Sequence, residues 1–263
     1  MGTFPRETKQ ISRSIMMPGH APAFRQFNYR MALSLRDLAA STTGYPKYLL
    51  APEVAVLLDA VTDLRKRMLF DLVWNTGARI NEALAVTPRD IVLDAVRPFV
   101  VLHTLKQRMN PRPGRPRKNE PVKRAVPLLD AAFVARLRDH LATFTKHDTK
   151  PLWDVTDDTA RNWMSQAVSE CNRRGMRFSI PDVTPKTLRH SFAMHLAMNG
   201  SMPLTLQAYM GHRDFKSTQE YLRIFALDVE AGQPSGISFS YPADIARLTG
   251  DNVTIGSDIL SPD

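Results

Sequence analysis

Residues 184–222 carry the strongest structural pattern in the chain, and their sequence is TPKTLRHSFAMHLAMNGSMPLTLQAYMGHRDFKSTQEYL. Pro185 is suited to the first turn of a helix and Gly200 to the position just after one, so we expect a helix over 184–199. Apolar residues at helical spacing predict two shorter helices over 203–210 and 214–225. This stretch is therefore expected to form three consecutive helices.

Most of the remaining chain also shows helical spacing of its apolar residues. Helices are predicted to start near Leu50 and near Arg79, and to cover 68–74, 128–144 and 159–174. Short segments rich in β-branched residues predict strands over 91–93, 98–105 and 122–127. The expected fold class is mixed α+β and mainly helical, with a small antiparallel sheet that bears a long basic hairpin.

The composition is that of a globular protein with an excess of positive charge. Of the 263 residues, 43% are hydrophobic and 23% are charged, which excludes collagen-like and low-complexity proteins. The 35 Lys and Arg residues outnumber the 26 Asp and Glu residues, and the net charge of +9 favours a polyanionic partner such as nucleic acid. The single Cys171 excludes an internal disulfide, and no Cys/His cluster has zinc-ligand spacing. Without a signal peptide or a long apolar run, we expect no membrane contact and a cytoplasmic location.

The positive charge is concentrated in one proline-rich segment. Residues 106–124 hold eight basic residues and one acidic residue, and four prolines exclude a regular helix. We therefore expect an extended loop that contacts DNA, and the alternative is a solvated loop with no role. The candidate DNA-binding residues of this loop are Arg108, Arg112, Arg115, Arg117 and Lys118. Residues 222–263 hold two basic and six acidic residues, so this tail is not expected to lie on DNA.

Four short motifs carry side chains suited to chemistry on a phosphate. They are TGARINE at 76–82 with Arg79 and Glu82, TLKQR at 104–108 with Lys106, KTLRH at 186–190 with Lys186, Arg189 and His190, and GH at 211–212, which precedes Tyr221. Lys186 and Arg189 share a helix face near the N-terminus, where unpaired backbone N–H groups already favour an anion. Two cations there repel each other unless something negative joins them, which favours a bound phosphate. Taken singly, the other motifs are equally explained by a surface ion pair, a solvated lysine and a core tyrosine.

The order and spacing of the four motifs resemble those of the tyrosine recombinases, also called the phage integrase family. That family has an Arg in a TGxRxxE segment, a Lys on a β-hairpin, an HxLRH segment, a GH pair, and a nucleophilic Tyr nine residues after the His of that pair. Here 23 residues separate Arg189 from His212 and nine separate His212 from Tyr221, as in the family. The resemblance extends from Tyr48 to about Phe225.

This resemblance implies transesterification on a DNA phosphodiester. Attack places extra negative charge on the nonbridging oxygens, which Arg79 and Arg189 would hold with permanently charged, bidentate groups. Tyr221 would attack the scissile phosphate and form a 3′-phosphotyrosine that conserves the bond energy, so no ATP is needed. No cofactor and no divalent metal are implied, because the two guanidinium groups neutralise the charge that a metal would otherwise neutralise.

The remaining family positions have supporting roles, and one departs from the family pattern. By the same resemblance, Lys106 would protonate the leaving 5′-oxygen, His212 would donate a hydrogen bond to a phosphate oxygen, and Glu82 would hold the active-site helix and its Arg. Lys186 stands where most members have His, and it would either accept the tyrosine proton or act only as a positive charge. His190 belongs to the family's common RH pair, and its expected role is structural.

The chain is short for this family, whose members usually carry a larger N-terminal domain of DNA-clamping helices. We expect residues 1–47, with a helical patch over 27–38, to form an N-terminal arm or a reduced DNA-clamping subdomain. Residues 48–226 are expected to form the catalytic domain, and residues 227–263 an acidic tail that either docks a helix on a neighbouring protomer or is solvated. Short members occur among plasmid multimer-resolution recombinases and promoter-switching invertases.

These observations favour a site-specific DNA recombinase that acts through a 3′-phosphotyrosine in plasmid multimer resolution, DNA inversion or integration. The expected partners are double-stranded DNA with a specific recombination site, further copies of the chain in a synaptic homo-tetramer, and accessory DNA-bending proteins, on nucleoid or plasmid DNA. One alternative is a nicking-closing topoisomerase, which the short step from His212 to Tyr221 disfavours. Another is a catalytically impaired DNA-binding regulator of the same fold, which only Lys186 supports.

Overall fold

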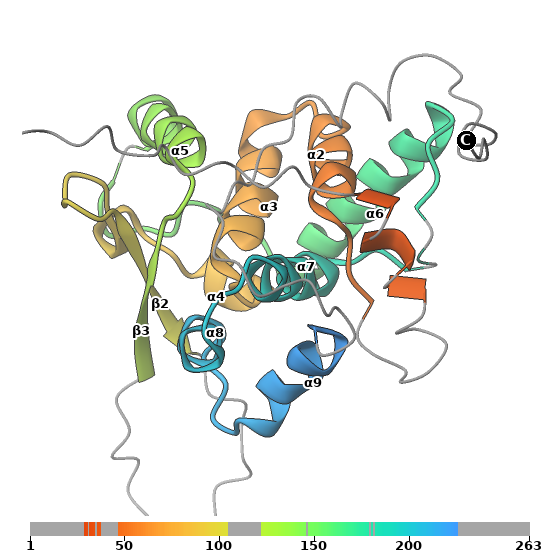
Figure 1. Ribbon diagram of the computed structural model, residues 1–263. Coiled ribbons are helices and arrows are strands. Elements are labelled where there is room, and N and C mark those ends of the chain that lie inside the picture. Colours follow the sequence, from red (N-terminus) through yellow and green to blue (C-terminus); the bar gives the residue numbers. More distant parts are fainter. Residues whose placement is uncertain are drawn as a thin grey trace, which may run out of the picture.

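The computed structural model describes residues 29–30, 32–34, 36–37, 47–104, 122–145, 147–178, 180 and 182–225. Its elements in chain order are α2 (Ala51–Asp59), α3 (Leu64–Thr76), α4 (Ile80–Leu84), the 3-10 turn η1 (Pro88–Asp90), β1 (Ile91–Val92), β2 (Phe99–Thr104), β3 (Val122–Pro127), α5 (Ala131–Phe144), α6 (Asp157–Arg173), α7 (Pro185–Met198), α8 (Pro203–Met210) and α9 (Lys216–Phe225). The predicted α+β fold, mainly helical with a small antiparallel sheet, is confirmed (Figure 1). Within these residues no helix is both long and apolar enough to cross a membrane.

Local sequence signals determine where α3 begins and ends. Asp63 caps the helix, because its carboxylate accepts hydrogen bonds from the backbone N–H groups of Arg65 and Lys66 at 2.8 and 3.0 Å. Gly77 ends the helix with a φ of 62°, and a Cβ at this position would lie 2.3 Å from the ring of Phe192 on α7. The chain can therefore turn sharply between α3 and α4 while it lies directly against α7.

The three strands form one antiparallel sheet in the order β1-β2-β3. The register pairs Val100 with Val126 and Leu102 with Arg124. Paired residues of antiparallel strands lie on the same face, and side chains along a strand alternate between the two faces. Since Val100, Leu102 and Val126 are buried, Arg124 shares the face that packs into the core.

Helices α3 and α7 form the centre of the helical core. α3 packs against α2, α5 and α7, whereas α7 also contacts α8 and α9. α8 packs against β3. As Figure 1 shows, α8 and α9 lie below α7 on the side of the molecule toward which β2 and β3 extend. This arrangement brings the turn before α4, the start of α7, the end of α8 and α9 toward one site.

The described residues between 29 and 37 are helical, as predicted for 27–38, and they pack against α2. Arg36 forms a buried ion pair with Glu53 in the first turn of α2, with nitrogen–oxygen distances of 2.6 and 3.0 Å. The hydroxyl of Tyr29 donates to the same carboxylate at 3.2 Å. This part of the chain is therefore attached to the helical core by hydrogen bonds to Glu53 and to the backbone carbonyl of Tyr48, and by the burial of Ala32.

Candidate active site

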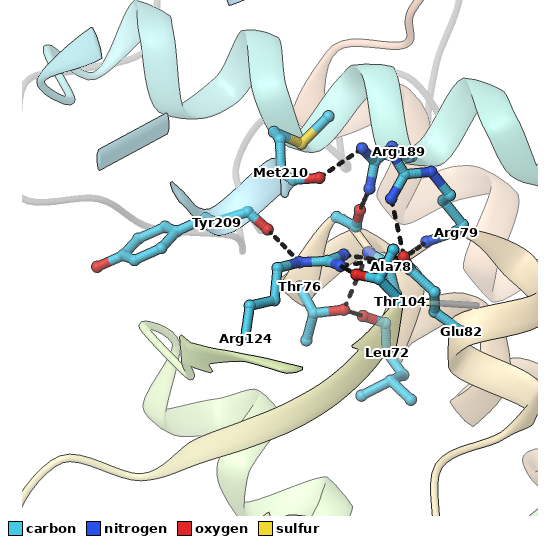
Figure 2. A network of polar contacts seen from close by, with 11 residues as sticks. Leu72, Thr76, Ala78, Arg79, Glu82, Thr104, Arg124, Arg189, Tyr209 and Met210 are labelled. Carbon is cyan, nitrogen blue, oxygen red and sulfur yellow. Dashed lines mark hydrogen bonds and ion pairs between the residues drawn. The ribbon is translucent and has the colours of Figure 1, made fainter. Parts of the chain in front are cut away.

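Arg189 in α7 lies at the centre of the site and is buried. Its Nη1 donates a hydrogen bond to the backbone carbonyl of Gly77, and its Nη2 donates to that of Met210 at 2.6 Å (Figure 2). Burial and the positive charge of Arg79 lower the pKa of Arg189 to about 9. The guanidinium group therefore bridges the turn before α4 and the end of α8.

Arg79 immediately precedes α4 and is joined to Glu82 within that helix. The Glu82 carboxylate accepts hydrogen bonds from the backbone N–H of Arg79 at 2.9 Å and from its Nη1 at 2.8 Å. The Arg79 side chain is 44% exposed, whereas that of Glu82 is 1% exposed. Glu82 therefore caps the helix and orients a guanidinium group that reaches solvent.

Arg124 in β3 is a site residue that the sequence analysis missed. Its Nη1 and Nη2 donate to the two carboxylate oxygens of Glu82 at 3.0 and 2.6 Å, and its Nε donates to the carbonyl of Tyr209 at 2.9 Å. Burial alone would raise the pKa of Glu82, but the hydrogen bonds and charge of Arg124, together with Arg79, lower it to about 2. Counting Arg124 with the basic loop obscured this role, although the alternation that buries Val126 places Arg124 on the same face.

Tyr221 lies in α9, and its hydroxyl group is in direct contact with α7. The distance between the Tyr221 oxygen and Nδ1 of His190 is 2.7 Å. The ring of His190, for which the expected role is structural, therefore touches the hydroxyl group of Tyr221. The ring of His212 stacks on that of Tyr221, with centroids 6.1 Å apart, and its Nδ1 lies 3.0 Å from the hydroxyl of the buried Thr218.

Burial keeps the side chains of His190, His212 and Tyr221 uncharged at neutral pH. Burial lowers the pKa of His190 to about 4, with contributions from the charges of Lys186, Arg189 and His212. Burial and the guanidinium groups lower the pKa of His212 to about 4 as well. Burial raises the pKa of Tyr221 to about 12, although Arg189 acts in the opposite direction. At neutral pH, Nδ1 of the uncharged His190 ring can therefore accept a hydrogen bond from the hydroxyl of Tyr221.

The structure brings most of the predicted site residues together. Arg79, Glu82, Arg189, His212 and Tyr221 meet where α4, α7, α8 and α9 converge. Lys186 lies one turn before Arg189 in α7, is exposed, and acts electrostatically on His190. Lys106, Arg108, Arg112, Arg115, Arg117 and Lys118 lie outside the described residues. Within the described part of the chain, no group of three His, Cys, Asp or Glu residues could hold a metal ion.

Comparisons with known proteins agree with this geometry. Residues 47–227 match the phage integrase family. An Escherichia coli protein named probable site-specific recombinase in afa region is 47% identical over 204 residues, which cover 78% of this chain and 81% of that protein. An E. coli protein named resolvase is 43% identical over 229 residues, which cover 82% of this chain and 87% of that protein.

A solved structure shows the same fold. The XerH site-specific recombinase bound to its difH substrate, in a pre-cleavage complex, superposes with a TM-score of 0.50 at 20% identity. The match covers 70% of this chain and 53% of the XerH chain. On the family match and on the identity with its E. coli relatives, the chain belongs to the phage integrase family of tyrosine recombinases, as its four motifs predicted.

Proposed function

We propose that this chain is a site-specific DNA recombinase that cuts and rejoins DNA by transesterification, with Tyr221 as the nucleophile. The observation that carries the proposal is the contact of the Tyr221 hydroxyl with His190, in a site that Arg79 and Arg189 make positive. The guanidinium groups would bind the phosphate that the phenol attacks. The E. coli relatives named as a site-specific recombinase and as a resolvase support this activity.

Arg79 and Arg189 would bind the nonbridging oxygens of the scissile phosphate. Glu82 orients the first guanidinium group, and two backbone carbonyls orient the second. Groups that are oriented before substrate binds stabilise developing charge most effectively, because little reorganisation is needed in the transition state. His212 would add a third donor: when its Nδ1 accepts from the Thr218 hydroxyl, its Nε2 carries the hydrogen and can donate to a phosphate oxygen.

The proton of Tyr221 would pass to Nδ1 of His190 as the phenol oxygen attacks. In this step the O–H bond breaks, the bond from the tyrosine oxygen to phosphorus forms, and the bond from phosphorus to the 5′-oxygen breaks. The low pKa of His190 in the free protein is set by burial and by adjacent cations. A bound phosphate offsets those cations and raises the pKa of the ring, so the ring becomes a stronger base when substrate is present.

Two lysines would complete the reaction. Lys106 would give a proton to the departing 5′-oxygen, which leaves as a hydroxyl group. Lys186, exposed in the first turn of α7, would act as a positive charge beside the phosphate. Rejoining reverses the steps: a 5′-hydroxyl gives its proton to Lys106 and attacks the phosphotyrosine, and the tyrosine oxygen leaves and recovers its proton from His190.

We propose double-stranded DNA with a specific recombination site as the substrate. The XerH recombinase was solved bound to its difH substrate, and the Tn1549 transposon integrase was solved in complex with transposon right end DNA, which supports a DNA partner. In this proposal residues 48–226 form the catalytic domain, residues 105–121 add phosphate contacts, and residues 1–47 form a reduced clamping segment. Residues 227–263 would contact a neighbouring copy of the chain in a synaptic homo-tetramer. Accessory DNA-bending proteins would assist this assembly, which would act on nucleoid or plasmid DNA.

The proposal is tested by trapping the covalent intermediate. The purified protein is incubated without added metal with DNA fragments from the cell that carries its gene, and the reaction is stopped with detergent. We expect a protein–DNA adduct whose attached sequence identifies the recombination site. The adduct should be absent for Tyr221→Phe, which should still bind DNA.

Tyr209→Phe is the matched control for this experiment. Tyr209 contributes its backbone carbonyl to the site, while its ring points away from the guanidinium groups (Figure 2). This variant should form the adduct at the parent level. Absence of an adduct with the parent protein, or an adduct that persists in Tyr221→Phe, would contradict the proposal.

A further inference from the structure

Arg124 lies at the base of the basic hairpin, but its side chain is only 8% exposed. Its two terminal nitrogens contact both carboxylate oxygens of Glu82, at 3.0 and 2.6 Å. A guanidinium group that is engaged and buried in this way is not available to the DNA backbone. Any effect of Arg124 on the reaction must therefore pass through the residues that it holds.

Glu82 is the first link from Arg124 to the phosphate-binding groups. Because Arg124 contacts both carboxylate oxygens, Arg79 contacts Glu82 through one guanidinium nitrogen and leaves 44% of its side chain exposed. Without Arg124, Arg79 would be the one guanidinium group of the described residues that hydrogen-bonds to Glu82. The carboxylate would then draw Arg79 into a bidentate pair and away from a phosphate.

The end of α8 is the second link. Nε of Arg124 donates to the carbonyl of Tyr209 at 2.9 Å, and the carbonyl of the next residue, Met210, accepts from Arg189 at 2.6 Å. A Cβ at Gly211 would lie 2.9 Å from Nη1 of Arg124, so the guanidinium group packs directly on the residue before His212. Arg124 therefore supports the backbone that holds Arg189.

We propose that Arg124 is a positioning residue of the active site: it ties the supports of Arg79 and Arg189 to β3, so that both guanidinium groups keep the spacing that one phosphate requires. This inference rests on the proposed function. A hydrogen bond from Nη1 to the Thr104 hydroxyl, at 3.2 Å, extends the connection to β2. The two strand ends that flank residues 105–121 and the two phosphate-binding arginines thus form one connected unit (Figure 2).

The test compares Arg124→Met with Arg136→Met. Arg136 in α5 pairs at 2.8 Å with Asp71, which is also buried, so each substitution removes the arginine from a buried carboxylate. The substrate is a DNA duplex with the sequence that the adduct identifies. Its cleavage is measured in single turnover at saturating DNA, at a temperature where both variants are folded. We expect Arg124→Met to cleave about 100-fold more slowly with a nearly unchanged Kd for DNA, and Arg136→Met to cleave at the parent rate. Equal rates for the two variants, or a loss confined to DNA affinity, would overturn the proposal.

A second measurement does not depend on cleavage. In the parent protein the two hydrogen bonds from Arg189 to backbone carbonyls should slow rotation of its guanidinium group and give separate Nη–H signals in NMR spectra. These signals should merge in Arg124→Met, or in Arg124→Lys if the first variant does not fold, and stay separate in Arg136→Met. Separate signals in the folded Arg124 variant would refute the positioning role. A parent protein that forms no adduct would refute the proposed function, while the NMR result would still decide the role of Arg124.

Discussion

The two sides of the active site are stabilised in opposite ways. On the side of Arg79, Glu82 and Arg124, opposite charges lie in direct contact, and the pKa of Glu82 is lowered to about 2. On the side of His190 and Tyr221, burial keeps both groups neutral, with pKa values of about 4 and 12. The first side is charged and organised before DNA binds, whereas the second is uncharged until a substrate changes its surroundings.

A bound phosphate would act differently on these two sides. On the charged side it would bind to guanidinium groups that are already oriented, and their protonation would change little. Beside His190 it would offset the charges of Lys186 and Arg189 that lower the pKa of the ring. In the proposed mechanism, proton transfer from Tyr221 to His190 would therefore be favoured once a phosphate is bound. Four predictions test this contrast.

The largest effect is expected from Arg189→Ala, which breaks the charged side. The substitution removes a phosphate donor and the bridge between the carbonyls of Gly77 and Met210. We expect single-turnover cleavage to fall by about 10³-fold, the scale of losing one oriented donor in a transition state. Far-ultraviolet circular dichroism should show that the fold persists, and near-normal cleavage would refute the assignment of Arg189 to the phosphate.

The next effect concerns the neutral side, where comparison of His190→Ala with His190→Asn separates proton acceptance by His190 from hydrogen bonding alone. Both variants lose the ring that takes the proton, but the Asn side chain can still accept a hydrogen bond near the position of Nδ1. If His190 is the base, both should cleave about 100-fold more slowly and lack the fall in rate that protonation of His190 causes at low pH in the parent. Recovery of the rate by Asn would show that hydrogen bonding alone is needed. His147→Asn, at an exposed loop position, is the control and should change neither rate nor pH profile.

The set of Arg79, Arg189, His212 and Tyr221 could be predicted only through the resemblance of four motifs to the tyrosine recombinases, because these residues lie far apart in the chain. The helices and strands could be predicted because their signals are local. Capping residues and helical spacing of apolar residues identified α7 and its neighbours. Those signals depend on residues a few positions apart, which is also the distance over which helix geometry acts. They required no knowledge of how the elements pack.

The contacts of Arg124 with Glu82 and of His190 with Tyr221 could not be predicted because they join distant segments of the chain. Arg124 meets Glu82 across 42 positions in the chain, and His190 meets Tyr221 across 31. The density of basic residues over 106–124 indicated a solvated loop that includes Arg124. In the structure β3 packs against α8, and the Arg124 side chain is buried beside the carboxylate of Glu82. The rule of alternation along a strand could have indicated its direction, but not its partner.

A smaller effect is expected on the acid stability of the charged side. Because the pKa of Glu82 is lowered from its ordinary value of 4.5 to about 2, its stabilising contribution is complete above pH 4.5 and is lost as the pH falls toward 2. Chemical denaturation at pH 7 should show Glu82→Gln to be less stable than the parent by about 3 kcal/mol, and the difference should shrink over that acid range. Asp94→Asn, which removes an exposed ion pair with Arg138, should cost less than about 1 kcal/mol. A pH-independent difference for Glu82→Gln would contradict the ion-pair explanation.

The smallest effect is expected from Lys186→Met, which alters the neutral side through charge alone. Lys186 lies four residues before His190 and lowers the pKa of its ring, so removing the ammonium group should raise that pKa above about 4. NMR titration of the His190 ring in the absence of DNA measures this shift directly, and Lys216→Met, at an exposed position of α9, should leave it unchanged. If Lys186 acts only as a charge, cleavage should fall by about tenfold in Lys186→Met and recover in Lys186→Arg, because an arginine cannot act as a base at neutral pH. A Lys186→Arg variant as slow as Lys186→Met would instead make Lys186 the group that accepts the proton of Tyr221, and His190 would then only orient the phenol.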